Sequence, residues 1–204
     1  IIASSTSGYK PSTLQQFCGN HPERVIVAHP FNPVYLIPLV ELVGGEKTPA
    51  HIMERAENFY QSASMKTLIV RHEIEGHIAD RLMEALWREA LHLVNDGVAT
   101  TEEIDDSIIY GAGLRWALMG PFLTFHLAGG EQGMRHMLDQ FGPALKSPWT
   151  KLVAPELTED LKEKVIAGTA AQSEGSTIKE LEEKRDNFLI ELQDLLQKYW
   201  SEAK

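Results

Sequence analysis

The hydrophobic pattern of this chain changes at about Gly76, and this change limits the folds open to it. Before that point, short runs rich in Val, Ile and Leu have the length and composition of β-strands. They cover residues 1–4, 24–28, 39–43 and 67–70. A stretch with helical spacing, 49–62, separates the last two runs. Strands interleaved with a helix predict part of an α/β sheet.

From Gly76 onward only helical periodicity remains. The predicted helices cover residues 78–95, 100–111, 121–128, 131–141, 158–171 and 177–199. Gly97 is placed as a helix stop, and Thr100 with Glu103 forms a capping box. We interpret Gly111-Ala112-Gly113 as another stop, because it lacks the third glycine and the preceding strand of a dinucleotide fingerprint. The pattern predicts an α/β part followed by an all-α part, and a mostly α chain overall.

Composition excludes several classes of partner. A formal net charge of −10 argues against nucleic acid and anionic membrane surfaces, and no apolar run is long enough to cross a bilayer. Cys18 is the only cysteine, so we expect no disulfide, no zinc cluster or other metal site, and a cytoplasmic location. The first residues carry neither an initiator Met nor a signal-peptide pattern. We therefore interpret the chain as the C-terminal portion of a longer protein.

His29 is the leading candidate for chemistry. Prolines 30, 33 and 38 restrict the path from it to Glu41, in the third strand run. A lone histidine at a strand end is more often satisfied by a backbone carbonyl than catalytic. Here, however, Ser4-Ser5-Thr6-Ser7 ends the first run and His29 and Asn32 follow the second. Open α/β sheets bind ligands at such strand ends, and a histidine held by a carboxylate is a general base near neutral pH. The pattern favours an enzyme.

Four motifs together resemble the 3-hydroxyacyl-CoA dehydrogenase superfamily, the NAD-dependent L-3-hydroxy acid dehydrogenases. They are Ser4-Ser5-Thr6-Ser7, His29-Pro30-Phe31-Asn32-Pro33, Val40-Glu41 and Gly76-His77-Ile78-Ala79-Asp80-Arg81-Leu82. The resemblance implies that residues 1–75 are the last part of a Rossmann-type NAD-binding domain. It implies that residues 76–204 form a helical substrate and dimerisation domain, and that the protein is a homodimer with NAD as cofactor.

The same resemblance implies roles for individual residues. His29 would accept the substrate hydroxyl proton as hydride leaves for NAD, and Glu41 would orient and charge-stabilise it. Ser7 and Asn32 would hydrogen-bond the reacting oxygen. The hydroxyls at positions 5 and 6, Ser5 and Thr6, would lie against the cofactor. No Gly-x-Gly-x-x-Gly occurs in the 204 residues, so we expect that motif upstream, and this portion alone to be inactive.

Two further stretches resemble the branch of the family that oxidises L-carnitine: Ala85-Leu86-Trp87-Arg88-Glu89-Ala90 and Leu114-Arg115-Trp116-Ala117. Carnitine is a 3-hydroxy acid with a quaternary ammonium, which cannot donate a hydrogen bond and needs aromatic faces with a carboxylate nearby. The aromatic candidates are Phe31, Tyr35, Trp116 and Phe122, with Trp87 more simply explained by core packing. Asp80, where the family has Asn, is either the anion of this site or an acid favourable to a helix start. Arg115 could pair with the substrate carboxylate.

Three other functions stay open at this point. Within the family, the substrate could be L-gulonate or a 3-hydroxyacyl-CoA. In another class, a non-catalytic structural protein like lambda-crystallin would have the same apolar helices and acidic surface. Such a protein has no need of Ser7, His29, Asn32 and Glu41, and this set favours the dehydrogenase.

Overall fold

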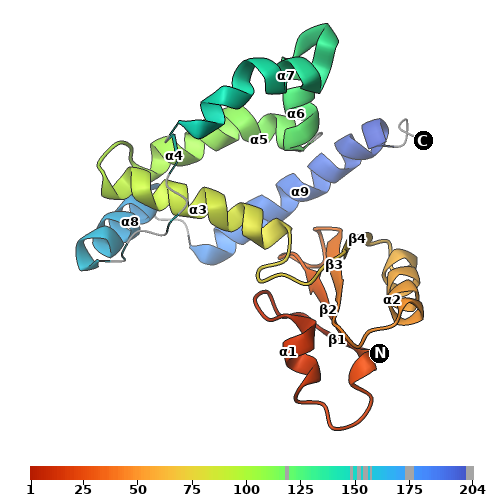
Figure 1. The fold of residues 1–204 in the computed structure, drawn as a ribbon. Coiled ribbons are helices and arrows are strands. Elements are labelled where there is room, and N and C mark those ends of the chain that lie inside the picture. Colours follow the sequence, from red (N-terminus) through yellow and green to blue (C-terminus); the bar gives the residue numbers. More distant parts are fainter. Residues whose placement is uncertain are drawn as a thin grey trace. The chain divides into compact units, whose positions relative to one another are not determined.

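The computed structural model describes residues 1–117, 120–147, 149–150, 153, 156, 158–172 and 177–200. The chain divides into two compact units, Ile1–Ala85 and Leu86–Lys204. The first unit holds the four-stranded sheet, and the described residues of the second unit are helical or irregular (Figure 1). This arrangement confirms the predicted fold class.

The elements of the first unit are β1 (Ile2–Ser4), α1 (Pro11–Gln15), the 3₁₀ turn η1 (Pro22–Arg24), β2 (Val25–Pro30), β3 (Leu39–Gly44), α2 (Ala50–Ser62) and β4 (Lys66–Val70). Helix α3 (Ala79–Asn95) begins in the first unit and continues into the second. The second unit then holds α4 (Thr101–Ser107), the π turn η2 (Ile108–Ala112), α5 (Gly113–Trp116), α6 (Pro121–Ala128), η3 (Gly130–Gln132), α7 (Gly133–Phe141), η4 (Gly142–Lys146), α8 (Glu159–Gln172) and α9 (Ile178–Trp200).

The strands follow the order β1-β2-β3-β4. Strand β2 pairs in parallel with β1 but antiparallel with β3, and β4 runs parallel to β3. The antiparallel ladder continues as far as the Pro30–Val40 pair, so His29 lies within β2. Our expectation that His29 follows the strand is therefore wrong. The run of apolar residues ends at Ala28, but the backbone pairing does not.

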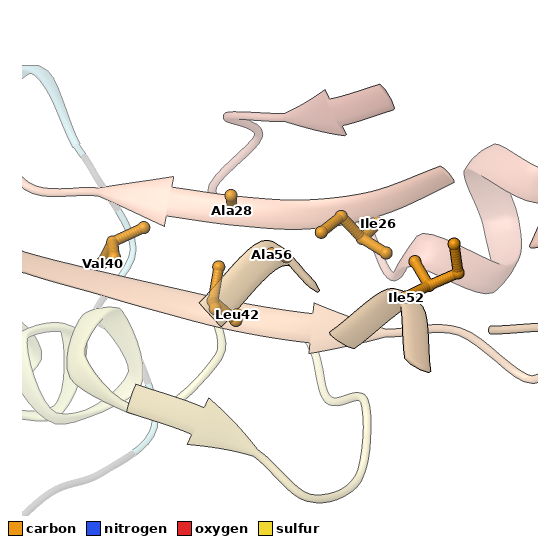
Figure 2. Close-up of a cluster of buried hydrophobic side chains, with 6 residues drawn as sticks. All are labelled: Ile26, Ala28, Val40, Leu42, Ile52 and Ala56. Carbon is orange, nitrogen blue, oxygen red and sulfur yellow. The ribbon is translucent and has the colours of Figure 1, made fainter. Parts of the chain in front are cut away.

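Two hydrophobic clusters sandwich the sheet. On one face, residues of β2 and β3 pack against Ile52 and Ala56 of α2 (Figure 2); the strand residues are Ile26, Ala28, Val40 and Leu42. On the other face, Val27, Val43 and Val70 pack with Leu14 of α1. Burial on both faces explains why these strands are apolar apart from His29 and Glu41, with each large apolar side chain contributing roughly 1.5–3 kcal/mol. Since strand side chains alternate, His29 and Glu41 share the α1 face with Val27 and Val43.

The long helices match their sequence signals. Helices α2, α3, α6, α8 and α9 lie close to the predicted ranges, and Gly97 adopts a φ of +67° just after α3, as a helix stop requires. The predicted stop at residues 111–113 is a one-residue interruption. Gly111 has a non-helical φ of −115° and ψ of −108°, and helical backbone resumes at Ala112 and continues into α5. A Cβ at Gly113 would lie 2.7 Å from the carbonyl oxygen of Ile108, so close approach explains this glycine.

In the second unit, α6 packs against α7, and α4 packs against α8. Leu91 of α3, Leu161 of α8 and Leu196 of α9 are its buried leucines among the described residues. Within the same residues, every helix is too short or too polar to cross a membrane. The break between the predicted helices 158–171 and 177–199 falls largely at positions 173–176, outside the described residues.

Candidate active site

The centre of the candidate site is a cross-strand pair, His29 on β2 and Glu41 on β3. The two residues lie directly opposite each other in the antiparallel ladder. His29 Nδ1 is 3.2 Å from Glu41 Oε2, and both side chains are buried. The strand register itself therefore sets the distance between imidazole and carboxylate.

Glu41 has a second set of partners. Its Oε1 accepts hydrogen bonds from the backbone N–H groups of Ile78 at 2.9 Å and Ala79 at 3.0 Å, at the N-terminus of α3. With Oε1 accepting two N–H groups, the Glu41 carboxylate acts as a hydrogen-bond acceptor at Oε2 as well. His29 Nδ1 must then carry the hydrogen, which leaves a lone pair on Nε2.

Two groups face that lone pair. The Ser7 Oγ lies 3.1 Å from His29 Nε2, at the distance at which its hydroxyl donates to nitrogen. Asp80 Oδ2, from the first turn of α3, lies 3.5 Å from the same nitrogen. The Asp80 side chain is 26% exposed, and Ser7 is also exposed, so the Nε2 side of the buried imidazole opens to the surface.

Aromatic rings surround the imidazole on its other sides. Phe31 meets it edge-on, with ring centroids 5.1 Å apart. His77, which the sequence analysis assigned no role, is fully buried with its ring centroid 5.4 Å from that of His29. Its Nε2 lies 3.3 Å from the carbonyl oxygen of Thr6.

Among the other predicted residues of the first unit, Thr6 reaches this cluster through its carbonyl oxygen. Asn32 is exposed, and within the described part of the chain no hydrogen bond links it to His29 or Ser7. Ser5 and Tyr35 are exposed as well. Arg115 and Trp116 lie in α5 and Phe122 in α6, so they belong to the second unit and their roles stay predictions.

Two contacts of this site lie outside the sequence prediction. One is the bond from Glu41 to the start of α3, for which a signal exists: no Ser, Thr, Asp or Asn directly precedes the helix, so its cap must come from elsewhere. The other is His77. Its place beside His29 depends on the turn between β4 and α3, which no local pattern announces.

The arrangement is suited to taking a proton from an alcohol. A hydroxyl bound at Nε2 would give its proton to His29, and the carboxylates of Glu41 and Asp80 would favour the resulting imidazolium. The described residues bring together a base, a hydroxyl and two acids. Oxidation of an alcohol also needs a hydride acceptor. The exposed hydroxyls of Ser5 and Ser7 follow β1, at the carboxyl end where such sheets bind ligands, and these are the residues that could hold NAD.

Comparison with known proteins identifies the family of this chain. Residues 1–74 match the model of the 3-hydroxyacyl-CoA dehydrogenase NAD-binding domain, and residues 76–173 match that of its C-terminal domain. The L-carnitine dehydrogenase of Bacillus cereus is 70% identical over 203 residues, which are 100% of this chain and 62% of the relative. That of Oceanobacillus iheyensis is 66% identical over 200 residues, 98% of this chain and 65% of the relative. The chain thus spans about three-fifths of the length of these relatives.

Solved structures show the same fold. The structure of 5-formyl-3-hydroxy-2-methylpyridine 4-carboxylic acid 5-dehydrogenase, described as an NAD⁺-dependent dismutase, matches with a TM-score of 0.74 at 26% identity, covering 97% of this chain and 64% of that one. The (S)-3-hydroxybutyryl-CoA dehydrogenase of Ralstonia eutropha matches with a TM-score of 0.55 at 26% identity, covering 82% of this chain and 56% of that one. With its two halves matching the two domains in order, the chain belongs to the 3-hydroxyacyl-CoA dehydrogenase family.

Proposed function

We propose that this chain is part of an NAD-dependent dehydrogenase that oxidises the hydroxyl of L-carnitine, giving 3-dehydrocarnitine. The observation that carries the proposal is the Ser7–His29–Glu41 array, which leaves a proton-accepting lone pair on His29 Nε2 at the surface side of the site. The 70% identity to an L-carnitine dehydrogenase supports this choice of substrate.

In this mechanism the substrate hydroxyl binds between Ser7 and His29. The Ser7 hydroxyl turns from Nε2 to hold the substrate oxygen, and Nε2 accepts the hydroxyl proton as the carbon–oxygen double bond forms. Glu41 stabilises the imidazolium through Nδ1. NAD, when bound, supplies the acceptor for the hydride that leaves the same carbon.

Asp80 would recognise the cation of carnitine. The trimethylammonium is attached to the carbon next to the one that carries the hydroxyl. A hydroxyl at His29 Nε2 therefore brings the ammonium beside the Asp80 carboxylate, which is 3.5 Å from that nitrogen. The ring of Phe31, in contact with His29, adds an apolar surface for the methyl groups. Arg115, Trp116, Phe122 and Tyr35 remain candidates for the rest of the substrate.

The proposal extends to the whole protein. We place the NAD-binding part in residues 1–75, the helical part in 76–204 and the homodimer contact in the helical part. A single cysteine supports a cytoplasmic location.

The test is to assay the full-length enzyme with NAD and L-carnitine, L-gulonate or 3-hydroxybutyryl-CoA, following NADH formation. L-carnitine should have the highest kcat/KM. Replacing the base, His29→Ala, should lower kcat by roughly 10²- to 10⁴-fold while NAD binding stays intact. The matched control is His72→Ala at an exposed histidine outside the site, which should leave kcat unchanged. Activity on the CoA ester alone would rule out carnitine, and a folded protein inactive on all three would favour the structural reading.

A further inference from the structure

His77 is a buried polar residue that the proposed mechanism does not use. Its side chain is fully buried, and it follows Gly76 in a turn where both residues have positive φ, +69° and +49°. A non-glycine residue rarely adopts this backbone conformation, and such residues gather at functional sites. The turn holds the buried His77 imidazole against the ring of His29.

The hydrogen bonding of His77 fixes its tautomer. The Thr6 carbonyl oxygen can only accept, so the His77 Nε2 that lies 3.3 Å away must carry the hydrogen. Nδ1 is then a buried acceptor, and no donor among the described residues reaches it. A phenyl ring would fill nearly the same volume without an unpaired nitrogen. For packing alone, a phenyl ring would therefore be the better side chain at this position. What the imidazole adds is the hydrogen bond to the Thr6 carbonyl.

Thr6 is the residue before Ser7, in a segment without regular secondary structure between β1 and α1. Ser7 itself is exposed, yet its hydroxyl must lie within hydrogen-bonding distance of His29 Nε2. A donor on the preceding carbonyl restricts the peptide that leads into Ser7. His77 thus contacts both partners of the Ser7–His29 bond, the base through its ring and the serine through the backbone.

We propose that His77 is a positioning residue that acts through Ser7: its Nε2–H holds the Thr6 carbonyl so that the Ser7 hydroxyl faces the base. The inference rests on the proposed function, because it assumes that Ser7 holds the reacting oxygen. It assigns a role to the nitrogen of His77, beyond the ring that packs on His29.

The experiment compares two substitutions in the full-length enzyme, His77→Phe and His77→Gln. Phe keeps the ring and removes the donor, whereas Gln loses the ring and keeps an N–H that can reach Thr6. With L-carnitine, His77→Phe should lower kcat by about 10- to 100-fold at equal or higher Tm. His77→Gln should retain more of kcat than His77→Phe does. The reverse order of the two variants, or a wild-type kcat in His77→Phe, would overturn the proposal.

A double-mutant cycle with Ser7→Ala separates positioning from a general packing defect. If His77 acts through Ser7, adding His77→Phe to Ser7→Ala should cause no further loss of kcat. If the losses of kcat caused by the two substitutions instead multiply in the double variant, the proposal is overturned. Crystal structures of the variants give a readout that does not need activity: Ser7 Oγ should leave His29 Nε2 in His77→Phe and stay there in His77→Gln. An enzyme inactive on carnitine would refute the proposed function, and an unmoved Ser7 in His77→Phe would refute this inference.

Discussion

At the scale of one residue, we expect Asp80 to distinguish a cationic from a neutral substrate. It is a partly exposed carboxylate 3.5 Å from His29 Nε2. At close range a charge pair contributes from about 1 kcal/mol in water to about 4 kcal/mol near a protein surface. We expect Asp80→Asn, which keeps the shape and removes the charge, to lower kcat/KM for L-carnitine about 10-fold or more.

The carbon isostere of carnitine, 3-hydroxy-5,5-dimethylhexanoate, provides the comparison, since it has a tert-butyl group in place of the trimethylammonium. Asp80→Asn should leave its kcat/KM unchanged or raise it. The control Glu54→Gln removes an exposed acid on α2 and should affect neither substrate. Equal losses on both substrates would show that Asp80 supports the helix start and does not recognise the cation.

Glu41 shows which part of the site a sequence can predict. The motif identified Glu41 and His29, because histidine next to a carboxylate is a recognisable chemical pair. It could not reveal that the two are opposite each other in an antiparallel ladder, since register depends on the pairing of distant segments. Nor could it show that the second carboxylate oxygen caps α3, a contact across 37 positions of sequence.

At the scale of elements, the start of α4 depends on a capping box. The Thr100 hydroxyl accepts from the backbone N–H of Glu103, and the Glu103 carboxylate accepts from the backbone N–H of Thr100 at 2.8 Å. That backbone hydrogen bond first, and the Thr100 hydroxyl second, hold the pKa of Glu103 below its usual value of 4.5. The box therefore stabilises the fold above pH 4.5, and the stabilisation is lost as the pH falls through the lower folded-state pKa.

Glu103→Ala should lower the free energy of unfolding at neutral pH, and the difference from wild type should shrink on acidification. Urea denaturation followed by circular dichroism, at about pH 7 and about pH 3.5, measures both values. The matched variant Glu180→Ala removes the equivalent carboxylate beside Thr177 at the start of α9, where the pKa is also lowered, and should behave alike. A difference that persists unchanged in acid would mean that the Glu103 charge is not what stabilises α4.

The same boxes explain why the helices were predictable. Capping residues, Gly97 and Pro121 are local signals, readable within a few positions. Helix α1 was not predicted because five residues are too few to show a periodicity. In the sequence the two glycines at 111 and 113 look alike, but Gly111 interrupts the helical backbone whereas Gly113 is required by its close approach to the carbonyl oxygen of Ile108.

At the scale of the whole molecule, the boundary between the two family domains and the boundary between the two compact units lie at different positions. The family models change between residues 74 and 76, whereas the compact units divide after Ala85. The first turns of α3 account for the difference. Their backbone is bonded to Glu41 and Asp80 faces His29, so these turns pack with the sheet although they begin the helical sequence. We propose that the sequence boundary at 75/76 marks the domains and that α3 is shared by both.

Helix α6 supports the proposal that the whole protein is a homodimer. Its apolar side chains are exposed along its length: Phe122 81%, Leu123 60%, Phe125 50% and Leu127 63%. Exposed apolar patches of this kind mark interfaces. We expect the full-length enzyme to sediment as a dimer, and the double substitution Leu123→Asp with Leu127→Asp to shift it to a monomer, because buried unpaired carboxylates oppose association. Circular dichroism should show that the helices are retained, and Phe17→Asp, at an apolar position of the first unit that is also exposed, should leave the dimer intact. A dimer that survives the α6 substitutions would place the contact elsewhere in the helical domain, and a monomeric wild type would refute the homodimer.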